Sequence, residues 1–373
     1  MNYVTKTFPW LLLAPALLPL VYFDGLLYPY VAPKTFLFRG LGIVVFAAFT
    51  LLALSGQPFF WERLRQKLTW IPAALLAVAY ATSLIGVDFY HSFWSIYDRG
   101  DGLLTLTVAV LFFYVTLLYA DRGFLQRLFK IAAWIGSLSA LYVVLQWFQM
   151  VTGMNFPIIE ETKGRLGGTI GNAAFLASYL GMTVWAALAA LGEYRGMWRK
   201  VLYLGLALQF AAIIIAATRG TILALLIAGF FTLLYLGWRG EMRVRFLARV
   251  ALIVGVVLAG LFFGFREQLK QAPIESVRRI ASVSLQDETV SSRLFVWNNV
   301  LTVALERPLT GYGAEHVSSL FNRVYDPAAI LEQWFDRTHN AFLDYFVQYG
   351  VLGVLLYTGL IGSLGLAGFT LFL

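Results

Sequence analysis

Ten stretches of the chain are apolar almost without interruption, and most approach the roughly 20 residues that an α-helix needs to cross a bilayer. Hydrophobic residues occupy 60% of the 373 positions and charged residues 13%, against about 45–50% and about 25% in soluble domains. This composition excludes a soluble enzyme, a nucleic-acid-binding domain and a disordered chain, and predicts an all-α polytopic membrane protein. The ten predicted spans cover residues 9–23, 36–55, 69–86, 103–120, 128–151, 171–191, 201–217, 221–238, 247–264 and 349–373.

The spans divide the chain into three parts. Residues 1–264 form a predicted transmembrane bundle of nine helices, residues 265–340 form a long extramembrane loop, and residues 341–373 form the final transmembrane helix. The last apolar run reaches Leu373 without a basic residue or a polar tail behind it. Because a chain rarely ends inside hydrocarbon, we expect the natural chain to continue beyond this point.

Basic residues in the loops predict the orientation. Half of the 28 Lys and Arg residues lie on one side, at Lys6 and in loops 56–68, 121–130, 192–200 and 239–249. The opposite short loops hold only six, namely Lys34, Arg39, Arg99, Lys163, Arg165 and Arg219. Cytoplasmic loops are enriched in Lys and Arg, so the N-terminus is predicted to be cytoplasmic and loop 265–340 to face outward. Most carboxylates then also lie outside, where we expect the chemistry.

One amphipathic helix is predicted inside the long loop, over residues 293–306. The apolar residues of its one face are Leu294, Trp297, Leu301 and Leu305. Pro308 ends the pattern, and Gly311-Tyr312-Gly313 predicts a turn. Such a helix is expected to lie along the membrane surface with Trp297 at headgroup depth. A helix that only covers the bundle fits the pattern equally well.

His339 stands directly before the last helical run, in the sequence Arg337-Thr338-His339-Asn340. The positive end of the helix dipole there favours the neutral imidazole. A neutral imidazole accepts a proton, as a general base must. His339 is therefore a candidate base, although a histidine that caps the helix or anchors it at the interface would give the same pattern.

Arg219 lies in a five-residue hinge, 217–221, between two apolar runs. An arginine so close to hydrocarbon is costly unless it snorkels or meets an anion. Thr218 and Gly220 let the backbone turn sharply beside it, and a fixed guanidinium at such a place suits a phosphate or diphosphate. An arginine that serves only as an interfacial anchor is the alternative.

A glycine-rich turn at 164–172, which includes Arg165, precedes the sixth span. Its backbone amides suit phosphate oxygens, but it lacks the Gly-Lys-Ser/Thr ending of a nucleotide-binding P-loop. A tight turn at the membrane entry explains it equally well. Because the chain has no cysteine and no pair of histidines at ligand spacing, the sequence predicts neither a metal site nor a cofactor.

Four of these elements, in this order, resemble the O-antigen ligase family. The sequence His339-Asn340, nine residues and Gly350-Val351-Leu352-Gly353 is similar to the family signature His-(Asn/Ser/Gln)-x9-Gly-x-x-Gly. The other matching elements are the turn at Gly171-Asn172, the triplet Thr218-Arg219-Gly220, and the series Arg293, Trp297, Pro308 and Gly311-Tyr312-Gly313. The resemblance covers residues 165–360 or so, and the earlier spans only by hydropathy.

The resemblance implies a glycosyltransferase with an architecture similar to the C-type membrane enzymes. Such an enzyme moves a glycan from a polyprenyl-diphosphate carrier to an acceptor hydroxyl at the periplasmic face of the bacterial inner membrane, without metal or cofactor. The implied base is His339 and the implied diphosphate ligand is Arg219, with Arg165 and Arg293 as weaker candidates for contacting the leaving group or the acceptor. The supporting positions are Asn340, Gly220, Gly350 and Gly353.

Several alternatives stay open. Lipid A core, another glycan and a protein are all compatible acceptors, and a polysaccharide polymerase of the same superfamily would share these motifs. The family usually has about twelve spans, whereas ten are visible here. A transporter or flippase would carry charges in the middle of its spans, and the notable charges here lie at the outer rim, which favours glycosyl transfer.

Overall fold

The computed structural model describes residues 2–156, 159, 164–272, 275–282, 288–324, 326–329 and 335–372. Within these ranges the chain is helical, without strands, and helices make up 78% of it. Eight of the described helices are long and apolar enough to cross a membrane. The predicted all-α polytopic membrane protein is thereby confirmed. Lys163 and Leu373, used above for the orientation and the chain end, lie outside the described residues.

Nine of the ten predicted spans coincide with helices. Eight carry the candidate membrane spans, and the ninth, α5, is an apolar helix of 17 residues at the lower limit of a spanning length. The nine helices are α2 (Ala32–Leu54), α3 (Ile71–Leu84), α5 (Leu103–Tyr119), α6 (Arg122–Thr152), α7 (Ala173–Ala190), α8 (Gly196–Ile215), α9 (Arg219–Arg239), α10 (Met242–Gly264) and α15 (Ala341–Phe372).

The first predicted span, residues 9–23, differs from the expected single α-helix. Helix α1 (Asn2–Leu13) ends early, and a 3₁₀-helix, η1 (Ala14–Leu20), follows it. Pro15 and Pro19 explain the change, because a proline lacks the backbone N–H that an α-helix requires in its interior. Hydropathy detects the apolar run but not this interruption.

Shorter helices fill the connections between the long ones. They are η2 (Trp61–Arg65), η3 (Lys67–Trp70), α4 (Phe89–Trp94), η4 (Gly168–Ile170), η5 (Leu191–Glu193), α11 (Arg266–Leu269), α12 (Glu275–Ala281), α13 (Glu288–Ala304), α14 (Val317–Val324) and η6 (Pro327–Ala329).

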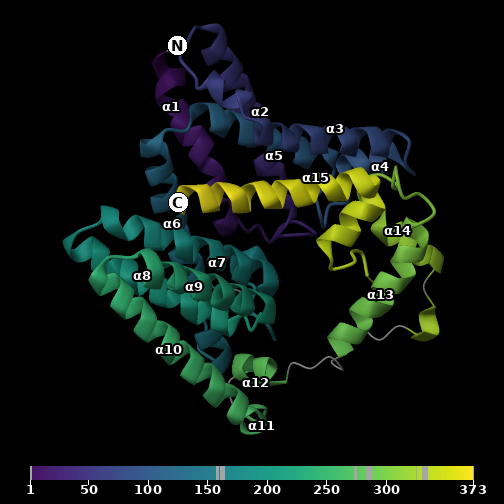
Figure 1. Ribbon diagram of the computed structural model, residues 1–373. Helices are drawn as coiled ribbons and strands as arrows, with labels where there is room; N and C mark the ends of the chain where they lie inside the picture. The colour runs from purple at the N-terminus through teal and green to yellow at the C-terminus, as the bar shows by residue number, and fades with distance from the viewer. Residues whose placement is uncertain are drawn as a thin grey trace. The chain divides into compact units, whose positions relative to one another are not determined.

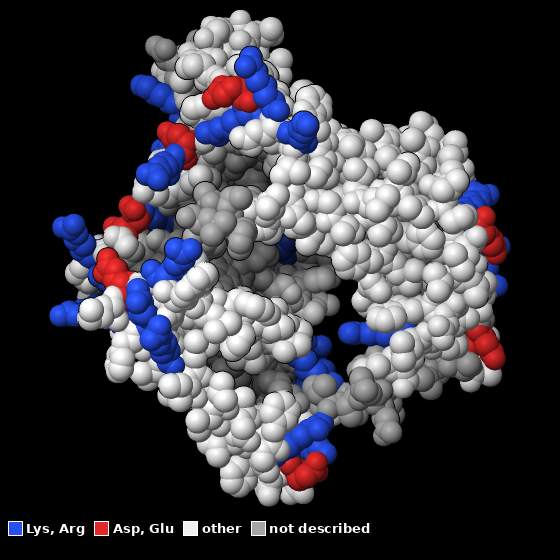
Figure 2. Space-filling view, viewed as in Figure 1, with Lys and Arg blue, Asp and Glu red and all other residues white. Residues whose placement is uncertain are grey.

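The chain forms two compact units. The first comprises Met1–Leu18, Phe23–Arg122 and Leu285–Leu373, and the second comprises Pro19–Tyr22 and Gly123–Ser284. In the first unit α2 packs against α5, and α3 packs against both α5 and α15 (Figure 1). The surfaces of α3 and of residues 351–366 of α15 carry no charged side chains in Figure 2, as lipid-facing helices require.

Helix α15 is broken at Gly350, whose backbone angles (φ 64°, ψ −165°) are not helical. The ribbon in Figure 1 changes direction sharply there and separates a short segment, 341–349, from a long one, 351–372. The loop before α14 supplies backbone hydrogen bonds at the break. The amides of Tyr312 and Gly313 donate to the carbonyls of Val347 and Gln348, both at 2.9 Å, and the Val351 amide donates to the Pro308 carbonyl at 2.9 Å. Backbone groups released by the break are therefore satisfied by a neighbouring loop.

A separate apolar core holds the short segment of α15 in place. Valines of α13 pack with Phe321 of α14 and with Val347 of α15. The buried valines of α13 are Val296, Val300 and Val303. The predicted face of Leu294 and Leu301 is instead exposed, as a lipid-facing role requires. The helix thus has two apolar faces, of which the sequence analysis recognised only one, and its place at the membrane surface stays a prediction.

The second unit is built around α7, which packs against α8 and α9. Small and aliphatic residues of α6, α7 and α8 form its core. A buried polar network crosses that core, because Gln209 of α8 donates to the Ser137 hydroxyl of α6 at 3.1 Å and accepts from the Thr183 hydroxyl of α7 at 2.9 Å. Such interhelical hydrogen bonds hold membrane helices together where apolar burial gives no driving force.

Candidate active site

His339 occupies a sharp turn immediately before α15. It is one of the few non-glycine residues with a left-handed backbone (φ 54°), and its side chain is exposed. The helix is capped by Asn340, whose Oδ1 accepts from the amides of Phe342 at 3.1 Å and Leu343 at 3.5 Å. His339 is therefore not the capping residue, and its imidazole is available for another role.

Thr338, directly before His339, is completely buried and fully hydrogen-bonded. Its amide donates to Oδ1 of Asp344 at 3.0 Å. Its hydroxyl lies 2.8 Å from the same oxygen and 2.9 Å from the Asn340 carbonyl oxygen, and its one proton can be donated to either. Its carbonyl accepts from the indole N–H of Trp297 at 2.8 Å, and its hydroxyl accepts from the Asn340 amide at 3.2 Å. These contacts fix the turn on both sides of His339.

Ion pairs tie the segment before His339 to the loop between α4 and α5. Arg99 of that loop binds Asp336 through Nε at 2.6 Å and also through Nη2. Arg337 pairs with Glu315 and, at 3.3 Å, with Asp101. Since Arg337 and Glu315 are largely buried, each supplies the opposite charge without which the other would be costly to bury.

The surroundings of His339 lower the pKa of its imidazole. Desolvation lowers the pKa of His339 below its ordinary value, and the Arg293 guanidinium lowers it further. The carboxylates of Asp336 and Asp344 act in the opposite direction and raise the pKa, while Arg99 lowers it. The direction agrees with the expected neutral imidazole, and its main causes are desolvation and Arg293.

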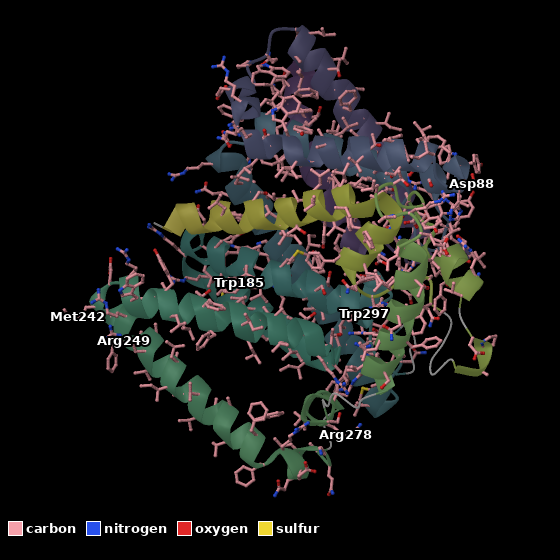
Figure 3. The ribbon with its side chains drawn as sticks, turned by 45° about the vertical axis from the view of Figure 1, so that its right-hand side comes forward. Asp88, Trp185, Met242, Arg249, Arg278 and Trp297 are labelled. Carbon is pink, nitrogen blue, oxygen red and sulfur yellow. The ribbon has the colours of Figure 1, made fainter. Side chains whose placement is uncertain are left out.

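A groove of about 500 Å³ adjoins this turn, between α13 and α15. Its polar lining includes Asn298 and Asn340, and most of the rest is apolar, with Trp297, Leu301 and Phe346 among the lining residues. Figure 3 labels Trp297 on α13. One indole therefore both lines the groove and binds the carbonyl of the residue before His339.

The second candidate region is the hinge between α8 and α9. Ala217 has a left-handed backbone (φ 51°), Thr218 is the N-cap residue, and Arg219 is the first residue of α9. A cation at a helix N-terminus faces the positive end of the dipole, which is unfavourable unless an anion is bound. The position of Arg219 therefore favours an anionic ligand.

Arg165 extends from the glycine-rich turn to the same hinge. Its Nη2 donates to the Thr218 hydroxyl at 2.8 Å and to the Ala216 carbonyl at 3.3 Å. Arg219 is half-buried, and its Nη2 donates to the Ser282 hydroxyl at 3.3 Å. Arg165, predicted from the glycine-rich turn, thus contacts the hinge that carries Arg219.

A groove of about 410 Å³ runs along this hinge, between α7 and α9. Thr218 and Gly220 line it at one end, together with the hydroxyls of Ser178 and Thr221. A Cβ at Gly220 would meet no atom within 4 Å, so this glycine is not required by packing. Trp185 of α7, labelled in Figure 3, also lines this groove.

The predicted site residues therefore fall into two groups. His339, Asn340 and Arg293 lie in the first unit, and Arg165, Arg219 and Gly220 lie in the second. Gly350 and Gly353 have packing roles, because a Cβ at Gly350 would collide with the Leu309 carbonyl and one at Gly353 with Tyr349. No group of three His, Asp or Glu side chains suited to a metal ion occurs in the described part of the chain.

Sequence reasoning missed Thr338, Asp344 and the hydrogen bond of Trp297. A signal for Asp344 was present, since a carboxylate in the first turn of a helix is favoured by the helix dipole. Its action through Thr338, however, depends on a turn that returns the chain toward the helix. Such a turn is not visible in the sequence pattern.

Residues 204–358 match the family model described as O-antigen ligase. The predicted family resemblance is confirmed. The O-antigen ligase match contains Arg219, Arg293 and His339, whereas Arg165 precedes it. It supports a membrane glycosyl-transfer enzyme of the O-antigen ligase and polymerase type, with a lipid-linked glycan donor and an acceptor. Comparisons with curated proteins and with solved structures return no match.

Proposed function

We propose that this protein transfers a glycan from a polyprenyl-diphosphate carrier to an acceptor hydroxyl at the outer face of the bacterial inner membrane. The observation that carries the proposal is the turn at His339, where an accessible imidazole is held with a lowered pKa. An imidazole that is neutral near neutral pH is ready to act as a general base.

In the proposed reaction the acceptor hydroxyl attacks C1 of the first sugar of the donor. His339 takes the hydroxyl proton, a new C1–O bond forms, and the bond from C1 to the diphosphate oxygen breaks. Polyprenyl diphosphate leaves with the electron pair of that bond, and the imidazolium then returns its proton to solvent. Atoms and charge balance without an oxidant or a reductant.

Arginines are the proposed ligands of the leaving diphosphate. Arg219 is the principal candidate because it stands at a helix N-terminus, where its own charge calls for an anion. A planar guanidinium binds phosphate oxygens through two parallel hydrogen bonds. Arg165 contacts the same hinge, and Arg293 is near enough to His339 to affect its charge. Both are proposed as additional ligands of the leaving group or the acceptor.

The test is a reaction with the purified full chain in lipid vesicles. A synthetic undecaprenyl-diphosphate oligosaccharide is supplied with lipid A core, a free glycan or a peptide as acceptor. We expect undecaprenyl diphosphate to be released only when a suitable acceptor is present, and to the same extent in EDTA. Repeated extension of one product would identify a polymerase. Movement of intact donor across the membrane without its consumption would contradict the proposal and indicate a transporter.

The proposed orientation has its own test. Because the chain contains no cysteine, single cysteines introduced at Leu64, Leu125, Met197 and Val244 give an unambiguous labelling pattern. We expect these four positions to be cytoplasmic and therefore protected from an impermeant reagent in intact cells. Labelling from outside would reverse the topology and place His339 on the wrong side for a periplasmic acceptor.

A further inference from the structure

The backbone at His339 is held in a conformation that it would not adopt alone. A left-handed φ of 54° is unfavourable for a residue with a Cβ and persists only where surrounding contacts impose it. The side chain of His339 does not supply those contacts, because it is exposed and its described ring contact is with Phe335, at 5.7 Å between ring centres. The constraint must therefore come from the neighbouring residues.

Thr338 supplies the constraint on one side of His339. Its amide donates to Oδ1 of Asp344, and its hydroxyl lies within hydrogen-bond distance of that oxygen and of the Asn340 carbonyl. Its carbonyl is bound by the Trp297 indole. The same hydroxyl accepts from the Asn340 amide, on the other side of His339. The backbone before and after the histidine is thus bound to one threonine side chain.

Asp344 connects that threonine to the helix. Its own amide donates to the Asn340 carbonyl at 2.9 Å, so it belongs to the first turn of α15. The segment that carries it, 341–349, is fixed by the core with α13 and α14 and by the loop at Tyr312. Asp344 therefore lies on a segment that is held in place, and its hydrogen bond with Thr338 attaches the turn at His339 to that segment.

We propose that Asp344, acting through Thr338, is the positioning residue that sets the orientation of the His339 imidazole. This inference rests on the proposed role of His339 as the base. A displacement of about 1 Å at a catalytic group is enough to cost about 100-fold in rate. The pair is therefore expected to govern turnover rather than substrate binding.

The charge and the hydrogen bonds of Asp344 are separable. The charged groups that act on His339 are Arg293 of α13, Asp336 of the preceding segment, Arg99 of the α4–α5 loop and Asp344 itself. Asp344→Asn retains an oxygen that accepts both hydrogen bonds but removes a negative charge that raises the His339 pKa. Asp344→Ala removes both, and Thr338→Val removes the hydroxyl while leaving the charge.

The experiment combines kinetics with histidine NMR on the full chain in lipid nanodiscs. With only three histidines in the chain, the His339 signal is assigned by its loss in His339→Gln. For Thr338→Val and Asp344→Ala we expect kcat to fall about 10- to 100-fold with KM nearly unchanged. The ring-current shift that Phe335 imposes on His339 should be lost in both variants.

The conservative variants sharpen the assignment. Thr338→Ser retains the hydroxyl and should recover kcat to within about threefold of the original chain, with the Phe335 shift intact. Asp344→Asn should also retain the shift, while the His339 titration and the acid limb of the pH profile move to lower pH. Thr302→Val is the matched control, because it removes an exposed hydroxyl that binds the Asn299 carbonyl of α13 at 2.7 Å.

Two results would overturn the inference. Unchanged kcat and an unchanged His339 signal in Thr338→Val would show that the turn keeps its shape without the threonine. If Thr338→Val fails to fold, an Asp344→Ala chain that folds and retains both kcat and the Phe335 shift would overturn the inference equally. An active His339→Ala chain would instead remove the base, whereas the NMR shifts of the other variants would still report on the turn.

Discussion

The turns at His339 and at Arg219 both precede a long apolar helix, and both contain a non-glycine residue with positive φ, His339 and Ala217. They are built differently. The first helix is capped by the Asn340 side chain, whereas Thr218 makes no side-chain cap of the second. At the first turn two carboxylates and two arginines act on the histidine with opposite signs. At the second turn two arginines donate to hydroxyls and a backbone carbonyl.

This difference indicates two kinds of task. A turn whose backbone groups are satisfied internally has little freedom, so it suits a side chain that must be aimed at a reacting atom. A helix start with added positive charge favours an anion electrostatically, so it suits the binding of a charged group. The four predictions that follow test whether the turn at His339 orients a catalytic group and the turn at Arg219 binds an anion.

The largest effect is expected when the imidazole is removed. His339→Ala should lower turnover about 10²- to 10⁴-fold, the usual loss for a general base, measured as undecaprenyl diphosphate release. His339→Gly is the decisive companion variant. Glycine accepts positive φ without strain, so this chain should melt no lower than the original and still be inactive. Recovery of activity by glycine would show that only the shape of the turn matters.

The next largest effect concerns the anion site. Arg219→Lys retains the charge but loses the planar pair of donors, and the loss of one charged hydrogen bond costs about 1.5–3 kcal/mol. We expect kcat/KM for the donor to fall roughly 10- to 150-fold. Arg249→Lys is the control, since Arg249 binds the Gly237 carbonyl at the opposite end of α9 at 3.0 Å. Equal losses in both variants would assign Arg219 to anchoring.

A smaller effect, on stability, is expected at the break in α15. Gly350→Ala introduces a Cβ that collides with the Leu309 carbonyl, at a residue with φ 64°. The strain at positive φ costs about 1–2 kcal/mol and overpacking about 1–3 kcal/mol. The melting temperature should fall clearly, whereas Gly362→Ala, with no atom within 4 Å, should leave it unchanged or slightly raised. A stable Gly350→Ala chain would contradict the packing role of this glycine.

The smallest effect is a shift in pH dependence. Arg293 lowers the pKa of His339, so Arg293→Gln should raise that pKa and move the loss of activity on acidification to higher pH. At a fixed mildly acidic pH the rate should fall about fivefold or less, since a charge pair near water is worth about 1 kcal/mol or less. Arg307→Gln is the control, because it removes a cation that lies over the Tyr312 ring. It should leave the acid limb of the pH profile unchanged. A shift to lower pH in Arg293→Gln would reverse the assigned electrostatics.

Periodicity and hydropathy predicted most of the fold. Unbroken apolar runs identify nine of the helices because burial in lipid requires a continuous apolar stretch, whatever the tertiary packing. The run at 9–23 was treated as one helix because hydropathy averages over prolines. The break at Gly350 was equally hidden, since it depends on backbone hydrogen bonds from a loop some 40 residues earlier.

The sequence singled out His339 and Arg219 as candidate reactive residues, which stays a prediction, but not the residues that hold them in place. His339 stands out as one of three histidines, directly before the last helical run, and Arg219 stands out because its hinge has only five residues between two apolar runs. Asp344 does not stand out, because its role depends on the chain folding back so that Thr338 meets it. The bond from Trp297 to the turn is likewise tertiary, since 41 positions separate the two residues.

The break in α15 at Gly350 has a consequence when the thickness of the surrounding bilayer changes. A helix whose apolar length does not match the hydrocarbon core responds by tilting. Were α15 continuous, such a tilt would swing its N-terminal end and carry His339 with it. Because the helix is interrupted, a tilt of segment 351–372 is not passed on to segment 341–349 as a rigid rod would pass it on, and segment 341–349 is packed against α13 and α14. We therefore expect the geometry at His339 to depend little on the lipid composition around the spanning segment.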